Sequence, residues 1–413
     1  MAGLKLHARI RKLMPFLVAM LLLIAAALTL FVRYPGNSKS FSVNLPRDFS
    51  VYLLASQRLA HGQSPYQASD PSPFKYSPGI LAWISILPQD PAVAWMTFST
   101  LNVLLLMLAL GLGHRYRRWP PVLALGLGIA WGWKGILETL DYGQLELTIM
   151  SLAILAAIFL KRRWNFAAGF FAGILPGIKL PWGILILPLW AMAARSTPPG
   201  QPLKYGGWRA LSSVSLGWFT ACFLWLAAGP SLLLGPERTL KLSQAWLKVI
   251  QEQPASLFTS DLNQSIWISI QRWGGGVIVW SVCGLALGWI LVGLARHTRR
   301  LAELTAVAWV APWLAFGQLI NPLAWRWGSA FWLVLPLSMS FRNPGRRPLF
   351  LVALVATLAL WLIQLNPVAR AMGAEHWTRF NAWGSITLFW SISLLAWRAS
   401  LLPPSAPREI PRA

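Results

Sequence analysis

Charged residues are scarce in this chain, and the motifs of several large enzyme classes are missing from it. Only 12% of the 413 residues are Asp, Glu, Lys or Arg, and the acidic ones number 12. The sequence has no GxxxxGK[ST] phosphate loop, no HExxH zinc motif and no glycine-rich dinucleotide signature. Nucleotide-driven chemistry and zinc hydrolysis therefore have no support, and we expect the chain to use neither a cofactor nor a metal.

Cysteines are equally few, and internal repeats are missing. Both cysteines, Cys222 and Cys283, fall inside apolar runs, so the sequence indicates neither a disulfide framework nor a CxxC metal site. No repeat of the kind expected of a two-half transporter is found.

Long apolar runs dominate the sequence. The mean hydropathy is +0.53, and the runs approach or reach the roughly 20 residues that cross a bilayer. We therefore predict an all-α polytopic membrane protein with about 10 to 12 transmembrane helices. The expected spans are about 13–32, 91–113, 120–139, 144–160, 165–178, 180–194, 210–228, 276–295, 302–320, 326–341, 348–364 and 381–397.

The net charge of +24 does not indicate a nucleic-acid partner, because the Lys and Arg residues fall in short clusters between the apolar runs. With the N-terminus in the cytoplasm, these clusters face the cytoplasm and most acidic residues face the other side. This arrangement of spans and charges predicts a plasma (inner) membrane protein with both termini cytoplasmic. It gives one membrane domain over 1–400, extracytoplasmic loops at 33–92 and 229–275, and a disordered tail at 401–413.

The first loop contains the sequence RDFSVYLLASQRLAHGQSPYQ. Apolar residues recur there at three- and four-residue steps, which predicts an amphipathic helix over 47–60 that lies on the membrane surface. Gly62 is expected to end this helix, and a second short amphipathic segment is expected from Ser77. The residues of the apolar face are Phe49, Tyr52, Leu53, Leu59 and Ala60.

Asp48 lies in the first turn of this helix, at the expected edge of the bilayer. Its carboxylate can bind free backbone N–H groups at the positive end of the helix dipole. It can equally serve as a general base. From the sequence alone the two roles have similar weight.

Short motifs on the extracytoplasmic side together resemble glycosyltransferase family 87, whose members have the GT-C membrane fold and use polyprenyl-phosphate sugars. Each motif is weak by itself, but the set runs in the family's order from about Asp48 to Trp325. The motifs are D-x3-Y at Asp48, GQSPY, FKYSP, a GQ pair opening a span, an Ala- and Gly-rich helix ending in Lys179, and NQS-x6-R ending in Arg272.

The resemblance implies a polyprenyl-phosphate-mannose-dependent α-mannosyltransferase that acts outside the cytoplasm. Asp48 would be the general base, taking a proton from an acceptor hydroxyl that attacks the anomeric carbon with inversion. The expected partners are a polyprenyl-phosphate sugar donor, a lipid-linked or cell-envelope glycan acceptor, and membrane lipids. Because the donor already carries its leaving group, one carboxylate suffices, unlike the pair that a glycosidase needs.

The departing phosphate needs fixed cations near it. Lys179 is the best candidate, because PGIKLPW leaves it few polar partners within an apolar helical pair; the alternative is that it extends to the interface. Arg326 and Arg272 are further candidates, each of which can also neutralise lipid headgroups. Lys75, Arg58 and Lys134 are weaker. The residues expected to bind the sugar or the acceptor are Tyr52, Tyr66, Tyr76, Gln144, Glu146, Asn263 and Gln264.

Two positions depart from the family pattern. Glu146 stands in GQLEL where the family usually has Asn, and Arg326 stands in NPLAWRW where it usually has His. Glu146 is a possible second carboxylate or an acceptor for sugar hydroxyls, and Arg326 can take over phosphate contacts. Both departures bear on sugar specificity.

Two other functional classes remain open on the sequence. A polytopic transporter or lipid flippase would place ionisable residues on broken helices, and Lys179 and Glu146 fit that description in part. A surface polysaccharide polymerase or ligase that uses lipid diphosphate donors would rely on the second loop, 229–275.

Overall fold

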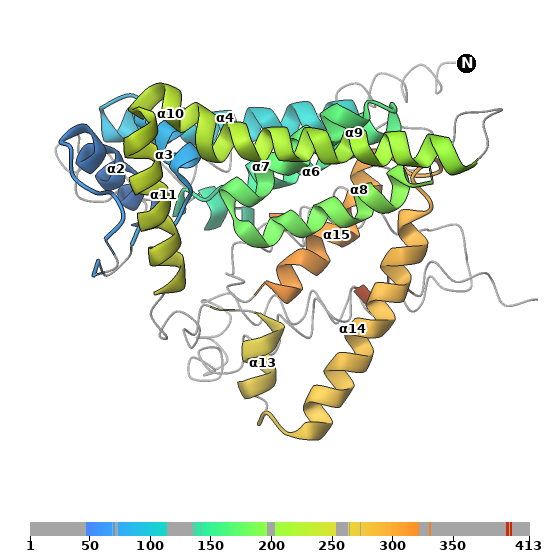
Figure 1. Cartoon of the computed structure of the whole chain (residues 1–413). Helices are drawn as coiled ribbons and strands as arrows, with labels where there is room; N and C mark the ends of the chain where they lie inside the picture. Colours follow the sequence, from blue (N-terminus) through green and yellow to red (C-terminus); the bar gives the residue numbers. More distant parts are fainter. Residues whose placement is uncertain are drawn as a thin grey trace, which may run out of the picture.

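The computed structural model describes residues 47–67, 69–70, 73–113, 135–136, 138–140, 142–195, 203–252, 263, 265–272, 274–321, 330–331, 394–395 and 397–398. All the elements assigned there are helices, which confirms the all-α prediction (Figure 1). Within this described part of the chain, three helical segments are long and apolar enough to cross a membrane: Pro91–Gly113, Gly207–Leu234 and Val277–Thr298. The predicted spans at 120–139 and 326–341, the one at 13–32 and those beyond 348 lie wholly or largely outside the described residues.

Most of the described residues lie in helices. In chain order they are α2 (Arg47–Ala60), α3 (Pro78–Ser85), α4 (Pro91–Gly113), α6 (Glu146–Lys161), α7 (Asn165–Ile178), the 3-10 helix η1 (Leu180–Leu185), α8 (Ile186–Ala193), α9 (Leu203–Phe223), the π-helix η2 (Leu224–Ala228), α10 (Gly229–Leu234), α11 (Pro236–Gln251), α13 (Ile266–Arg272), α14 (Val277–Thr298) and α15 (Ala306–Ile320).

Several boundaries agree with the sequence. The helix predicted over 47–60 and the spans at 91–113 and 165–178 have the expected ends, and α6 and α14 deviate by at most three residues. The segment at 180–194 differs, because it divides into η1 and α8. Pro181 is tolerated at the start of η1, where a missing N–H costs no hydrogen bond.

Helices α4, α6, α7 and α9 pack in succession, with α6 between α4 and α7 and α7 against α9. The α7–α9 contact relies on glycines. A Cβ on Gly169 would lie 1.9 Å from the Val214 carbonyl oxygen, and one on Gly173 would lie 2.3 Å from that of Trp218. Close approach of backbones at small residues is how apolar helices associate in lipid, where no hydrophobic force brings them together.

Replacing Gly169 with Leu should therefore separate α7 from α9. We expect a loss of about 3 kcal/mol, because a backbone oxygen cannot move aside as a side chain can. Thermal unfolding of the detergent-solubilised protein measures the effect. Gly284→Leu is the matched control, because no atom of the described residues lies within 4 Å of a Cβ at that position of α14. An equal loss in both variants would contradict the close-packing account.

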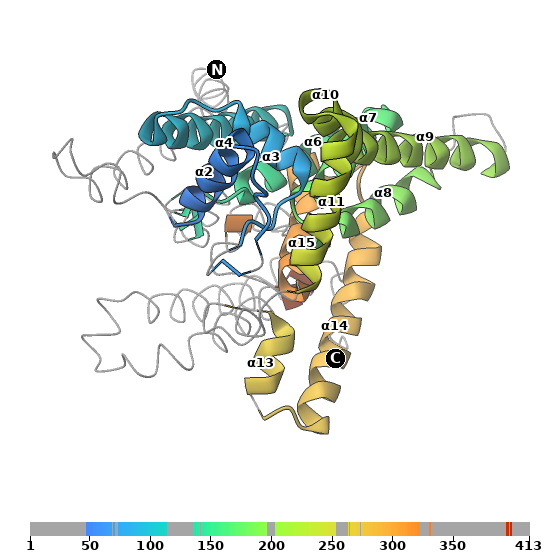
Figure 2. The ribbon, with the colours of Figure 1, turned by 60° about the vertical axis from the view of Figure 1, so that its left-hand side comes forward.

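Helix α2 buries one face against α4 and the segment before α3. Phe49, Tyr52, Ala55 and Leu59 are buried, whereas Ala60 at the helix end is exposed. The Phe49 ring lies 5.2 Å from that of Phe98 on α4. In both views α2 and α3 lie beside one end of α4 (Figures 1 and 2). The predicted apolar face is thus present, and its role is to pack against the protein.

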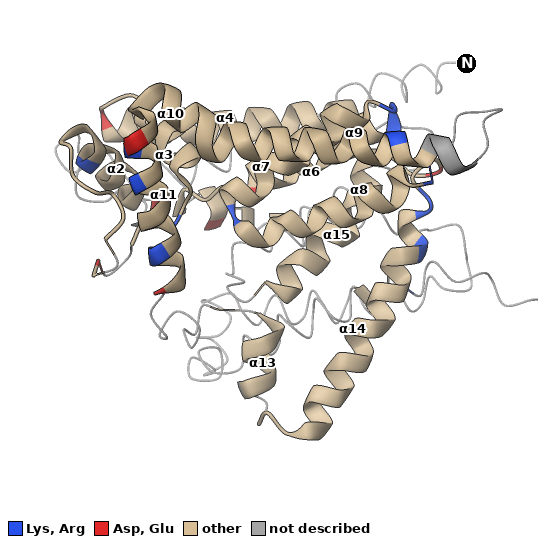
Figure 3. Ribbon diagram, in the orientation of Figure 1, with Lys and Arg blue, Asp and Glu red and all other residues tan. Residues whose placement is uncertain are grey.

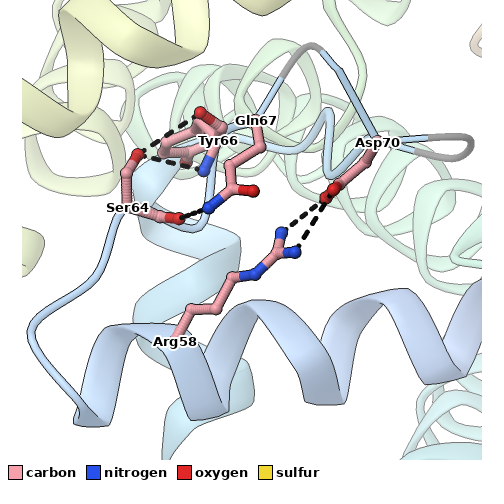
Figure 4. Close-up of polar contacts among 5 residues, drawn as sticks. All are labelled: Arg58, Ser64, Tyr66, Gln67 and Asp70. Carbon is pink, nitrogen blue, oxygen red and sulfur yellow. Dashed lines mark hydrogen bonds and ion pairs between the residues drawn. The ribbon is translucent and has the colours of Figure 1, made fainter.

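The chain after α2 is held by its own polar groups. Gly62 has φ +75°, a left-handed conformation that ends the helix as predicted. Arg58 donates to both carboxylate oxygens of Asp70, at 2.5 and 3.2 Å, and the Ser64 hydroxyl hydrogen-bonds with the backbone of Tyr66 (Figure 4). These contacts fix the segment that leads from α2 toward α3.

The two loops predicted outside the membrane contact each other. Helix α11, from the second loop, packs against α3. Its Trp246 Nε1 donates to the Lys75 carbonyl at 2.8 Å, and Arg238 donates to the Leu59 carbonyl at 2.6 Å. The second loop therefore braces the first one.

Charged residues gather at two ends of the molecule (Figure 3). Acidic residues lie mainly at the end that holds α2, α10 and α11. At the other end, the basic cluster 161–163 after α6 lies against the 299–305 segment after α14, because the Lys161 ammonium donates to the Leu304 carbonyl. Two of the basic clusters that the sequence places on one side of the membrane are therefore neighbours.

Candidate functional site

Five predicted site residues come together from four separate segments. Asp48 comes from the first turn of α2, Tyr76 from the segment before α3, Gln144 and Glu146 from the turn that opens α6, and Lys179 from the junction of α7 and η1. Hydrogen bonds link them into one network. The sequence placed these residues on one side of the membrane but gave no contacts among them.

Backbone geometry brings α2 to the start of α6. Gly143 has φ +70°, and a Cβ there would lie 2.7 Å from the Phe49 Cβ. Only glycine adopts this conformation without strain and leaves room for Phe49. The close approach carries the neighbouring Asp48 to Gln144.

Gln144 has a defined orientation. Its Oε1 accepts from the Tyr76 hydroxyl at 3.0 Å and from the Lys179 ammonium at 3.2 Å, and its Nε2 donates to Asp48 Oδ2. An ammonium group has no acceptor, so the amide oxygen must face it and the amide nitrogen must face Asp48. Gln144 thereby aims a donor at an acceptor oxygen of the carboxylate, which suits the ionised form of Asp48.

Lys179 and Glu146 form an ion pair with little exposure to solvent. The side chain of Lys179 is 19% exposed and that of Glu146 is 5% exposed. Lys179 has extended backbone angles, φ −143° and ψ 117°, that end α7 just after Pro176 and Gly177. The other carboxylate oxygen, Glu146 Oε2, is buried and has no hydrogen-bond partner among the described residues. A buried acceptor left without a donor is a place where a ligand hydroxyl gains a strong hydrogen bond.

Aromatic side chains surround Tyr76. The Tyr52 ring meets it edge to face at 5.0 Å, and the Tyr66 hydroxyl donates to the Tyr76 carbonyl at 2.9 Å. Burial raises the pKa of Tyr76 to about 12, so its hydroxyl stays protonated and able to donate. Burial also raises the pKa values of Tyr52 and Tyr66. The three phenols are therefore neutral donors at physiological pH.

Lys75, which the sequence ranked low, lies within the electrostatic reach of the network. Burial lowers the pKa of its ammonium to about 8; the charge of Asp48 opposes this shift and that of Lys179 adds to it. The signal for it was present in the FKYSP motif, where Lys75 directly precedes Tyr76. Its sequence neighbours are aromatic and gave no hint of two nearby charges.

The remaining candidates are less well placed by the structure. Asn263 is fully buried, and its Oδ1 accepts from the Ser265 amide at 3.0 Å, which caps the turn before α13. Gln264 and Arg326 lie outside the described residues, as does the side chain of Arg272. Their proposed contacts with the sugar or the phosphate stay predictions.

The chain matches a known protein family. A model of glycosyltransferase family 87 matches residues 74–336, which is more than half of the chain. The chain belongs to glycosyltransferase family 87 and is a membrane glycosyltransferase. The match covers Tyr76, Gln144, Glu146 and Lys179, whereas Asp48 lies before its first residue. No curated protein matches the chain.

Proposed function

We propose that the chain transfers one hexose, expected to be mannose, from a polyprenyl-phosphate donor to a lipid-linked or cell-envelope glycan at the extracytoplasmic face. The observation that carries the proposal is the network in which one carboxylate, Asp48, and one lysine, Lys179, bind opposite ends of the same amide, Gln144. A base and a phosphate-binding cation are thus held in one site by a shared side chain, and a direct displacement needs both groups oriented in this way.

In this mechanism, Asp48 removes the proton from the acceptor hydroxyl as that oxygen bonds to the anomeric carbon. The bond between the anomeric carbon and the phosphate oxygen breaks at the same time, and its electron pair leaves with the polyprenyl phosphate. Lys179 stabilises the negative charge that develops there. Attack from the face opposite the leaving group inverts the anomeric carbon.

Glu146 and the tyrosines provide the polar lining for the sugars. Glu146 Oε2, which has no partner among the described residues, can accept a hydrogen bond from a sugar hydroxyl. The Tyr76 ring lies under the Lys179 ammonium, which is 6.0 Å from the ring centroid. Arg272, Arg326 and Gln264 stay candidates for the phosphate and for the second sugar.

The donor is the first thing to test. Protein reconstituted in vesicles is incubated with membrane lipid extract and radiolabelled polyprenyl-monophosphate mannose, polyprenyl-monophosphate glucose or polyprenyl-diphosphate sugars in separate reactions. We expect label in a lipid or glycan product only with a monophosphate donor. Transfer from diphosphate donors alone would assign the chain to polymerase or ligase chemistry instead.

Gln144 is expected to position Asp48, so its replacement should slow transfer without weakening donor binding. Gln144→Met keeps the length and removes both the donor to Asp48 and the acceptor for Lys179. A base displaced by about 1 Å costs about 10² in rate. Measuring kcat and the donor KM separately checks this, because we expect kcat to fall and KM to change little. A loss confined to KM would assign Gln144 to substrate binding, the role predicted from the sequence.

A further inference from the structure

The charges of the site do not suffice for the proposed chemistry if Lys179 is its only phosphate-binding cation. Lys179 is already paired with Glu146 and hydrogen-bonded to Gln144. A polyprenyl-phosphate sugar is a phosphodiester with one negative charge, and the departing polyprenyl phosphate carries up to two. The charge that develops during transfer therefore needs a cation that no carboxylate has neutralised.

Lys75 is such a cation. Its side chain is half-buried, and among the described residues no carboxylate is ion-paired with its ammonium. Lys75 directly precedes Tyr76, whose hydroxyl donates to Gln144 at 3.0 Å, so its backbone lies at the edge of the network. The charges of Asp48 and Lys179 both act on its ammonium. We propose that Lys75 is a second ligand of the donor phosphate, acting beside Lys179 and holding the charge that appears as the polyprenyl phosphate leaves. This inference rests on the proposed function.

The backbone of Lys75 is rigidly held, as a phosphate ligand should be. Trp246 of α11 donates to its carbonyl, and the flanking Phe74 and Tyr76 pack against Tyr52. Because the backbone is already held, only the side chain loses freedom when it binds an anion, so more of the interaction contributes to transition-state stabilisation.

Burial brings Lys75 near its protonation midpoint in mildly alkaline solution. Its pKa of about 8 means that the ammonium is charged below this pH and loses its proton above it. A bound phosphate favours the charged form, so binding should weaken as the pH rises above 8.

The other charged groups near this segment do not change that expectation. Asp48 and Lys179 are the two that act on Lys75. On α11, Lys241 pairs with Glu237 and Lys248 pairs with Glu252 at the exposed surface. The remaining cation of α11, Arg238, donates to the carbonyl of Leu59.

The test measures binding of polyprenyl monophosphate, which carries no sugar, to the full-length protein in nanodiscs. We expect Lys75→Gln to weaken binding by about 10-fold to 100-fold, the usual effect of losing a charge-assisted hydrogen bond. Lys241→Gln, which removes an exposed lysine of α11 in the second loop, should leave binding unchanged. Polyprenol, which lacks the phosphate, should bind equally to all variants.

Lys75→Arg provides the second measurement and guards against a misfolded Lys75→Gln. Arginine stays charged at all accessible pH values, so this variant should keep its affinity for polyprenyl monophosphate above pH 8, where the wild type loses it. The inference is overturned if Lys75→Gln binds as the wild type does, or if Lys75→Arg shows the wild-type pH profile. Failure of the proposed function would look different, because wild-type protein would then transfer no sugar from any polyprenyl-monophosphate donor.

Discussion

Replacing Asp48 with Asn is expected to lower the rate of sugar transfer by about 10² to 10⁴, which is the usual contribution of a general base. The amide keeps the size of the carboxylate and can still accept the hydrogen bond from Gln144 Nε2. It cannot take a proton from the acceptor hydroxyl. The loss should therefore appear in the chemical step, measured as single-turnover transfer with saturating donor.

The same variant separates catalysis from helix capping. If Asp48 served only the helix dipole, Asn would cost about 0.3 to 1 kcal/mol of stability and leave turnover intact. Asp70→Asn is the matched control, because Asp70 is a carboxylate of the same loop that is paired with Arg58. We expect it to transfer sugar at nearly the wild-type rate. Equal activity losses in both variants would indicate damage to the loop instead of removal of a base.

The spacing and length of the apolar segments were sufficient to predict the helices around the site. The three- and four-residue spacing at 47–60 predicted α2 with its correct ends, because one face of that helix is buried and the other carries polar side chains. Long apolar runs predicted α4 and α14, because length and composition alone identify a membrane span. The family, too, was recognisable from short motifs in the right order.

Contacts between distant segments were not predictable in the same way. The hydrogen bond between Asp48 and Gln144 joins residues 96 positions apart, and it depends on Gly143 approaching Phe49. Nothing in the local sequence specifies such a meeting. The same holds for Lys75, whose charge environment comes from Asp48 and Lys179 on other elements.

Glu146 shows how a departure from a family pattern acquires a physical meaning. The sequence offered it as a second carboxylate or as an acceptor for sugar hydroxyls. In the structure, one of its oxygens binds Lys179 and the other has no partner among the described residues. The Asn that the resemblance leads one to expect at this position could not neutralise a lysine. In this chain the positive charge of Lys179 is therefore partly neutralised by Glu146. This is consistent with a second phosphate-binding cation at Lys75.

Removal of Lys179 should have a large effect on both stability and transfer. Lys179→Met leaves the carboxylate of Glu146 buried without its ion-pair partner, and breaking such a pair costs about 3 to 5 kcal/mol. We expect a value near 3 kcal/mol, because Lys179 keeps 19% of its side chain exposed. Transfer should be almost lost, since the leaving phosphate and Gln144 both lose a donor. Thermal unfolding and initial rates of transfer check the two effects.

The double variant Glu146→Gln with Lys179→Met separates these effects. Removing both charges takes away the uncompensated carboxylate, so most of the stability should return. Transfer should not return, because stabilisation of the departing phosphate needs the cation itself and not only a folded site. A double variant that regains both would show that Lys179 serves the fold alone, and the phosphate would then have to be held by Lys75 or by the arginines.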